Sequence, residues 1–363
     1  GSASHNPFAD NGIKLFAAGG RKLADATEAR IESVLSGLGL LPDSGETEEP
    51  EPARALGADV GVIGTTGAAD VVAGYRQSLL DSLDGRRLGG ISLVLDCAHG
   101  AASTLGPEVL TAAGADVTVV HAAPSGININ DGAGSTAPDA LGDAVVRAGA
   151  DLGLALDGDA DRLLAVDHTG AVVDGDHLIA LLAIDRQARG LLTNDTVVAT
   201  VMANLGFRQA MDRRGITVVE TAVGDRYVLE ALATTGAVLG GEQSGHIIQT
   251  DRSTTGDGLL SALSVLDVLV RTDARLAEVA AAAMVSLPQV LVNVRLERRD
   301  DTMLDALAPA IAAAEGRLGD GGRVLVRASG TEPVIRVMVE AATAAVAQDE
   351  ADRLAEAVRT RTR

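Results

Sequence analysis

The sequence predicts an α/β fold of parallel sheets covered by helices, followed by a smaller α+β unit. Residues 92–120 and 196–220 each have the pattern of an apolar strand, a loop, a helix and a second strand. Predicted strands at 152–157 and 237–241 both run directly into loops of polar residues. From about residue 286 the pattern changes to alternating strands and long helices, which indicates a separate small domain.

The C-terminal part predicts a strand, a helix, a strand pair and a last helix. Residues 288–296 alternate apolar and polar side chains, as a half-buried strand does. Residues 303–318 favour a helix, although Pro309 stands inside it and proline disfavours a helix interior. A strand pair and an amphipathic helix follow, at 323–329, 334–340 and 342–361.

Composition and charge limit the classes of partner. The chain has 363 residues, of which 47% are hydrophobic and 1% aromatic, so it can build several cores from small aliphatic side chains. Its net charge of −20 argues against nucleic acid and against an anionic membrane surface as partners. No apolar run approaches the roughly 20 residues that span a bilayer. The acidic, proline-containing run 42–52 predicts a surface loop.

A single cysteine, Cys97, excludes an internal disulfide framework. Thiols persist in reducing compartments, so we expect a cytoplasmic protein.

Three carboxylates alternate in the loop after the strand at 152–157. Asp157, Asp159 and Asp161 can direct three oxygens at one point, which suits a hard cation such as Mg²⁺. Arg162 beside them offers a fork for phosphate or carboxylate. A solvated acidic turn is the alternative interpretation. An EF-hand is excluded, because its sixth and twelfth positions hold Arg162 and His168 instead of Gly and Glu.

The segment RASGTEPVIR predicts a phosphate cradle. Its small residues Ser329, Gly330 and Thr331 expose N–H groups and two hydroxyls in a turn. Arg327 and Arg336 flank that turn and can hydrogen-bond phosphate oxygens. A β-hairpin with surface arginines would have the same sequence, so the pattern alone leaves both interpretations open.

The segment GGEQSGHII follows a strand and presents three polar side chains at alternate positions. Glu242 and Ser244 can hydrogen-bond sugar hydroxyls, and His246 can contact substrate or transfer a proton. The alternative is an ordinary loop in which the histidine is hydrogen-bonded and has only a structural role.

The first residues of the chain contain a turn set by Asn6-Pro7. Ser4 lies in this turn, with His5 and Lys14 close in sequence. A serine that carries a phosphoryl group needs cationic neighbours to offset roughly two negative charges. A plain turn at the start of the chain is the alternative.

Taken together, the four loops resemble the α-D-phosphohexomutase superfamily. Its members carry a phosphoserine loop of the ASHNP type, a DGDxDR metal loop, a GExSGH sugar loop and a phosphate loop rich in Arg, Ser, Gly and Thr. The segments SASHNPFADNGIKLF, GININDGAGST (126–136), VGDRYVLE (223–230) and RASGTEPVIRVMVE resemble the branch that acts on glucosamine phosphates. The resemblance runs from residue 1 to the end of the chain.

The resemblance implies three similar mixed α/β domains around a central cleft, the first one incomplete, plus a smaller C-terminal α+β domain. Family members begin well before the phosphoserine loop, so we expect this chain to be truncated at its start. The domains are expected at 1–70, 71–168, 169–286 and 287–363. The C-terminal domain would act as a lid over the cleft.

The resemblance also implies an activity: interconversion of glucosamine 6-phosphate and glucosamine 1-phosphate through a phosphoserine and glucosamine 1,6-bisphosphate, on the route to UDP-N-acetylglucosamine and the cell wall. One Mg²⁺ would bind Asp157, Asp159, Asp161 and an oxygen of phosphorylated Ser4. The resemblance does not indicate which of His5, Lys14 and His246 transfers the proton. The catalytic group is Ser4, His5, Lys14 and Arg162. The substrate-binding group is Glu242, Ser244, His246, Arg327, Ser329, Gly330, Thr331 and Arg336, with Asp225 and Arg226 as further cleft residues.

Other functions fit parts of the same pattern. The loops do not indicate the substituent at C2, so a phosphoglucomutase or phosphomannomutase is the nearest alternative. A non-catalytic sugar-phosphate-binding fragment and a phosphatase with Asp157 as nucleophile are the others. The expected partner is a hexosamine phosphate, with no nucleic acid and no membrane, and the resemblance implies a homodimer.

Overall fold

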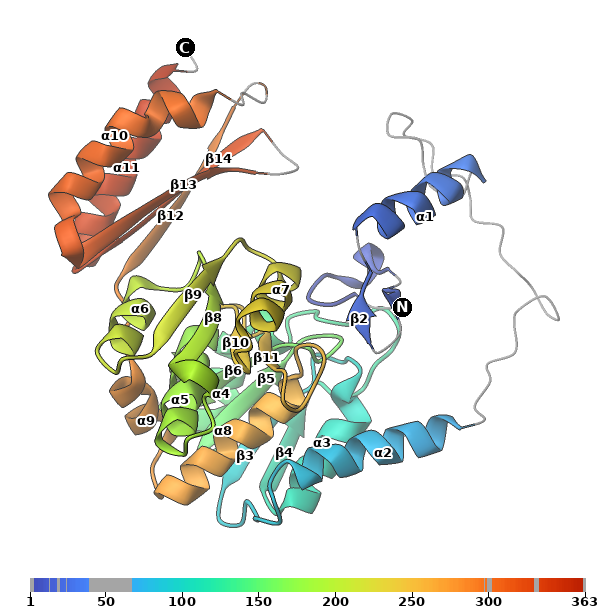
Figure 1. Cartoon of the computed structure of the whole chain (residues 1–363). Helices are drawn as coiled ribbons and strands as arrows, with labels where there is room; N and C mark the ends of the chain where they lie inside the picture. The colour runs from blue at the N-terminus through green and yellow to red at the C-terminus, as the bar shows by residue number, and fades with distance from the viewer. Residues whose placement is uncertain are drawn as a thin grey trace.

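The structure of the chain, a computed structural model, describes residues 3–12, 14–17, 20–23, 25–38, 67–296, 298, 302–329 and 333–361 (Figure 1). The predicted surface loop 42–52 lies outside the described residues, and so do Gly330 and Thr331 of the predicted phosphate cradle. Within the described parts, no helix combines the length and the apolar character needed to cross a membrane.

The N-terminal segment contains the serine turn and little regular structure. The amide of Asn6 donates to the carbonyl of Ala3 at 2.9 Å, which closes the turn that Asn-Pro predicts. A short 3-10 helix, a two-stranded antiparallel ribbon and one helix follow: η1 Phe8–Asp10, β1 Phe16–Ala17, β2 Arg21–Lys22 and α1 Asp25–Gly37.

The second unit is built on a five-stranded sheet of order β4-β3-β5-β6-β7. The strands β4, β3 and β5 run parallel, as the sequence predicts, whereas β6 and β7 join antiparallel. The sheet is mixed because the acidic loop returns the chain directly as a hairpin after β5. The strands are β3 Ser92–Asp96, β4 Asp116–Val120, β5 Leu152–Leu156, β6 Leu163–Asp167 and β7 Val172–Val173.

Helices cover both faces of this sheet, which explains why β5 is apolar at every position. Val94 and Ala155 pack with α4 on one face, whereas Leu93, Leu95 and Leu154 belong to the main core on the other. The helices of this unit are α2 Ala68–Asp81, α3 Ala102–Ala113 and α4 Pro138–Ala148, with a short η3 at Gly134–Thr136.

The third unit has a four-stranded sheet of order β11-β10-β8-β9. The strands β10, β8 and β9 are parallel, and β10 and β11 form an antiparallel hairpin around the predicted sugar loop. The strands are β8 Thr196–Thr200, β9 Thr217–Thr221, β10 Leu239–Gly241 and β11 Ile247–Gln249. The helices are α5 Gly175–Ala188, α6 Leu205–Asp212, α7 Asp225–Thr235, α8 Gly258–Thr272 and α9 Leu276–Ala283, with η4 at Thr193–Asp195.

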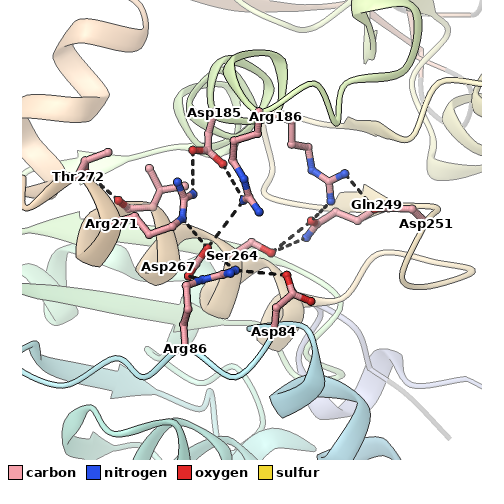
Figure 2. A network of polar contacts seen from close by, with 12 residues as sticks. Asp84, Arg86, Asp185, Arg186, Gln249, Asp251, Ser264, Asp267, Arg271 and Thr272 are labelled. Atoms are coloured by element: carbon pink, nitrogen blue, oxygen red, sulfur yellow. Dashed lines mark hydrogen bonds and ion pairs between the residues drawn. The ribbon is translucent and has the colours of Figure 1, made fainter.

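One hydrophobic core runs through both units, because side chains of both sheets, α5 and α8 belong to the same buried cluster. A polar network reinforces this connection (Figure 2). Asp267 on α8 accepts from Arg86 at 2.6 Å and from Arg271 at 2.9 Å, and Arg271 also donates to Asp185 on α5 at 2.8 Å. The loop after α2 and the helices α5 and α8 are therefore fixed to one another.

The C-terminal domain is a three-stranded antiparallel sheet with two helices on one face (Figure 1). The predicted helix at 303–318 is confirmed, and Pro309 inside it is exposed, so the carbonyl that loses its partner can bond water. The elements are β12 Gln289–Arg295, α10 Met303–Leu318, η5 Gly319–Gly321, β13 Gly322–Ala328, β14 Val334–Ala341 and α11 Ala344–Arg361.

A buried ion pair joins this domain to the third unit. Arg323 on β13 and Glu340 on β14 pair at 3.0 Å, with side chains 13% and 0% exposed. Arg323 also donates to the carbonyls of Val201 and Ala203 at 2.8 and 3.0 Å, and Glu340 accepts from the amide of Leu205 at 2.9 Å. The pair thus satisfies backbone groups of the neighbouring unit.

Replacing Glu340 by alanine should destabilise the protein. The change leaves the Arg323 guanidinium buried without its carboxylate, which costs about 3 kcal/mol or more of unfolding free energy. Urea denaturation followed by circular dichroism measures the loss. Glu356→Ala is the control, because Glu356 pairs with Arg359 at 3.6 Å with both side chains at least half exposed, and such pairs contribute little. Equal small losses in both variants would contradict the prediction.

Candidate functional site

The three aspartates of the predicted metal loop lie together at the carboxyl end of β5. One oxygen from each of Asp157, Asp159 and Asp161 lies within 4.8 Å of the others. Asp157 is fully buried, and its Oδ1 accepts from the amide of Arg162 at 3.1 Å. Ala160 turns the loop with φ 61°, a left-handed conformation, and its amide donates to the carbonyl of Asp157 at 3.0 Å. The loop backbone therefore holds the carboxylates together.

Cationic side chains surround this triad. Nζ of Lys14 lies 2.7 Å from Asp159 and 3.5 Å from Asp161. Nε of Arg162 lies 3.9 Å from both Asp157 and Asp161. The partial burial of Lys14 opposes its charge, but its hydrogen bond to Asp159 outweighs that effect and raises its pKa. The triad therefore forms ion pairs with Lys14, which belongs to a segment far away in the sequence.

The environment shifts the pKa values of two carboxylates of the triad in opposite directions. Burial raises the pKa of Asp157, and the neighbouring carboxylates of Asp161 and Asp159 raise it further. Burial also acts to raise the pKa of Asp161, but His246, Lys14 and Arg162 outweigh it and the pKa is lowered.

These residues fit a divalent cation such as Mg²⁺. Carboxylate oxygens are the ligands that Mg²⁺ prefers. Oδ2 of Asp157 is buried and has no hydrogen-bond partner among the described residues, so one oxygen of the donor set is left to a ligand. A cation there would also offset the mutual repulsion that raises the pKa of Asp157.

The serine turn lies directly on the acidic loop. The carbonyl of Ser4 accepts from the amide of Gly158 at 3.0 Å. A Cβ at Gly158 would lie 2.6 Å from that carbonyl oxygen and 2.7 Å from Ile129, so only glycine allows this approach. Oγ of Ser4 lies 3.3 Å from Nδ1 of His5. Partial desolvation and then Arg162 lower the pKa of His5.

The predicted sugar loop is joined to the acidic hairpin by its backbone. The amide of Leu163 donates to the carbonyl of Gly245 at 2.9 Å. Glu242 is half-buried and accepts from the amide of Gly224 at 3.0 Å, whereas Ser244 is exposed. His246 is only 3% exposed, and its Nδ1 lies 3.4 Å from Asp161. His246 is thus buried in contact with one carboxylate of the triad.

The arginines of the predicted phosphate cradle lie opposite each other in the C-terminal sheet. Arg327 on β13 and Arg336 on β14 are cross-strand partners. Burial and then the charge of Arg336 lower the pKa of Arg327. Like charges on directly opposite residues are unfavourable, so an anion bound between them would relieve the repulsion. Ser329, just beyond β13, is buried at 5% exposure.

A cavity of about 480 Å³ opens beside the triad. Asp257 lines it, accepts from the hydroxyl of Tyr75 at 2.8 Å and caps α8 through a bond from the amide of Leu260 at 2.9 Å. The polar side chains in its lining include Lys14, Tyr75, Asp159, Asp161, Asp225 and Asp257.

The sequence does not predict two residues that contribute to the site. Asn130 binds the serine turn through its side chain, and Gly256 packs against the ring of His246, where a Cβ would lie 2.4 Å from the ring. Asparagine and glycine in the run 126–136 indicate a turn, but no local pattern identifies a partner so distant in the sequence.

Four stretches of the chain match domains of the phosphoglucomutase/phosphomannomutase family. Residues 2–38 match its α/β/α domain I, 73–170 its domain II, 174–286 its domain III and 291–357 its C-terminal domain.

The chain is also similar to curated relatives. It is 55% identical to a phosphoglucosamine mutase of Clavibacter michiganensis subsp. michiganensis over 355 residues, which are 98% of this chain and 77% of that protein. It is 52% identical to a phosphoglucosamine mutase of Streptomyces avermitilis over 360 residues, which are 99% of this chain and 77% of that protein.

Solved structures share the fold. One is the Aspergillus fumigatus N-acetylphosphoglucosamine mutase in complex with GlcNAc-6P and magnesium, with a TM-score of 0.66 and 23% identity, covering 80% of this chain and 66% of that one. Another is a phosphoglucomutase/phosphomannomutase family protein of Burkholderia thailandensis, with a TM-score of 0.66 and 21% identity, covering 81% of this chain and 66% of that one.

Adding one methyl group at Gly158 should separate the serine turn from the acidic loop. Gly158→Ala forces the carbonyl of Ser4 away and costs about 1–3 kcal/mol of stability. Hydrogen exchange of residues 3–12 should rise. Gly89→Ala is the control, because a Cβ at Gly89 meets nothing within 4 Å. Unchanged exchange in the Gly158 variant would contradict the inferred contact.

Proposed function

The chain belongs to the phosphoglucomutase/phosphomannomutase family, and we propose on that premise that it interconverts glucosamine 6-phosphate and glucosamine 1-phosphate. The relatives reported above carry the name phosphoglucosamine mutase and are matched over three quarters of their length. The single observation that carries the proposal is the contact of the serine turn with the acidic loop: Gly158 donates to the Ser4 carbonyl at 3.0 Å. This contact supports the proposal, because it would hold a nucleophilic serine beside a cation site.

The first half-reaction transfers the phosphoryl group from phosphorylated Ser4 to the sugar. The free hydroxyl oxygen of the hexosamine phosphate attacks phosphorus, and the bond from phosphorus to Oγ of Ser4 breaks. The proton of the sugar hydroxyl is taken up by a protein base, and Oγ of Ser4 receives a proton from a protein acid as it leaves, which restores the serine hydroxyl. The product is glucosamine 1,6-bisphosphate.

The second half-reaction runs the same chemistry backwards after the bisphosphate has turned over in the cleft. Oγ of Ser4 gives its proton to a protein base and attacks the other phosphate, the bond from phosphorus to the sugar oxygen breaks, and that oxygen takes a proton from a protein acid. Ser4 is phosphorylated again, and the sugar leaves with its single phosphate at the new position. One serine therefore serves both half-reactions.

The residues around Ser4 would offset the negative charge of the transferred group. Asp157, Asp159 and Asp161 would hold one Mg²⁺ together with an oxygen of phosphorylated Ser4. When bound, that ion supplies electrostatic stabilisation of the phosphoryl oxygens. Lys14 and Arg162 add positive charge beside the triad, as phosphoryl transfer requires. His5, 3.3 Å from Oγ of Ser4, is a candidate for proton transfer beside Lys14 and His246.

The remaining residues would bind the substrate. Glu242 and Ser244 would accept or donate hydrogen bonds to sugar hydroxyls in either orientation. Arg327, Arg336 and Ser329, with Gly330 and Thr331, would hold the phosphate that does not react. His246 would act mainly by orienting Asp161, because it is buried against that carboxylate.

We place the reaction in the cytoplasm, in the supply of amino-sugar phosphate for UDP-N-acetylglucosamine and the cell wall. A homodimer is part of the same proposal, carried over from the family resemblance.

The purified chain, phosphorylated with glucose 1,6-bisphosphate and supplied with Mg²⁺, should convert glucosamine 6-phosphate to glucosamine 1-phosphate. Phosphorus NMR follows the two esters directly. Glucose and mannose 6-phosphates, assayed in parallel, should turn over more slowly. Faster turnover of the glucose ester would reject the glucosamine assignment. Binding of the sugar phosphate without any turnover would instead identify a non-catalytic binding fragment.

Asp159→Asn should weaken Mg²⁺ binding and lower the turnover of the loaded enzyme by about a thousandfold, since the ion supplies several kcal/mol of transition-state stabilisation. Isothermal titration calorimetry with Mg²⁺ measures the binding separately from activity. Asp143→Asn, on the exposed face of α4, removes the same charge and should change neither quantity. Unchanged Mg²⁺ affinity in the Asp159 variant would contradict the assignment of the triad as the Mg²⁺ site.

Ser4→Ala should abolish turnover while leaving sugar-phosphate binding intact, because it removes only the oxygen that carries the phosphoryl group. Mass spectrometry of the wild-type protein after treatment with the bisphosphate should find the phosphate on Ser4. A phosphorylated aspartate would contradict the mechanism and favour a phosphatase.

A further inference from the structure

We propose that Asn130 is a positioning residue for Ser4: its side-chain amide fixes the turn that presents the serine to the acidic triad. Asn130 lies outside the four loops that indicate the function. The inference rests on the proposed function for its catalytic consequence, but the positioning itself can be measured without activity.

The amide group of Asn130 bridges two carbonyls of the serine turn. Nδ2 donates to the carbonyl of Ser4 at 2.7 Å and to the carbonyl of Asn6 at 2.8 Å. Both hydrogens of the amide are therefore used on one turn. Asn130 is only 9% exposed, so water does not readily replace these bonds.

The backbone of Ser4 needs such support. Ser4 has φ 51°, in the left-handed region that residues with a Cβ adopt only at a cost. Its carbonyl accepts from Asn130 at 2.7 Å and from Gly158 at 3.0 Å, so both lone pairs are engaged. Fixing this carbonyl fixes the peptide plane after Ser4, and with it the direction of the serine side chain.

Asn130 is itself held firmly to the sheet. It adopts φ 60°, which asparagine tolerates better than most residues. Its backbone N–H donates to the carbonyl of Ala98 at 2.9 Å. The N–H of Ala98 donates to Asp96 at 2.9 Å, and Asp96 is fully buried at the end of β3. A continuous chain of hydrogen bonds therefore connects the end of a core strand to the serine.

The chemistry of the bridge requires an amide. Aspartate has nearly the same shape, but its carboxylate would face two carbonyl oxygens and could donate to neither. Glycine removes the side chain and keeps the left-handed backbone free of strain. The two substitutions, Asn130→Asp and Asn130→Gly, thus remove the bridge in different ways.

Asn128→Asp is the matched control. Asn128 lies two residues away in the same loop and binds only locally, accepting from the amide of Ser125 at 2.7 Å and donating to the carbonyl of Ala123 at 3.1 Å. The substitution Asn128→Asp introduces the same charge into the same loop and leaves the hydrogen bonds to the serine turn in place.

The expected result has two parts. In both Asn130 variants, hydrogen exchange of residues 3–12 should accelerate about tenfold or more, while the exchange of β5 is unchanged. With glucosamine 6-phosphate as substrate, kcat should fall by about 100-fold with KM little changed, because a misplaced nucleophile affects the chemical step. Asn128→Asp should behave as the wild type in both measurements.

Each other outcome has a defined meaning. Unchanged exchange of residues 3–12 in both Asn130 variants would overturn the proposal. Faster exchange with wild-type kcat would overturn it as well, because the turn would then not position the reacting serine. If the wild type has no turnover but the Asn130 variants exchange faster, the positioning stands and the proposed function fails.

Discussion

The site depends on a close backbone contact between two segments that are far apart in the sequence. Gly158 donates its amide to the carbonyl of Ser4 and presents no side chain there, so the serine turn reaches within hydrogen-bond distance of the acidic loop. The same loop carries the three carboxylates and Arg162. Because the serine turn and the acidic loop share this backbone contact, their relative position depends on peptide geometry as well as on the side-chain bridge from Asn130.

Several residues around this contact are held in left-handed conformations without being glycine. Ser4, Ala98, Asn130 and Ala160 have φ between 51° and 61°. Each such residue costs about 1 kcal/mol or more, and such strain persists only where the surroundings determine it. Here the surroundings are the apolar strands β3 and β5, whose residues are almost wholly buried. The stability of the shared core offsets the strain at its carboxyl edge.

The sequence predicts most of the fold and the acidic loop, because these features are local or periodic. Apolar runs define β3, β5 and β10, and alternate aspartates define the triad. It does not predict the bridge from Asn130 to Ser4 or the pair of Arg323 with Glu340, because each joins residues that only the tertiary fold brings together. It predicts that His246 contacts substrate or transfers a proton, but the burial of that ring against Asp161 follows from Gly256, whose missing side chain leaves room for it. Local patterns indicate which residues are reactive, and packing determines what they touch.

A net charge of −20 does not oppose the proposed binding of a phosphate ester, because the fold brings positively charged side chains together locally. Arg327 and Arg336 repel each other across two strands, and a phosphate would turn that repulsion into attraction. These arginines belong to the C-terminal domain, which contacts the third unit through the Arg323 and Glu340 junction. In the proposed function, phosphate bound to the arginines and sugar bound to the loop at Glu242 would therefore connect the C-terminal domain to the third unit through the substrate itself. A ligand with both groups would then stabilise an arrangement in which the two domains lie close together, whereas a ligand with only one of them would not.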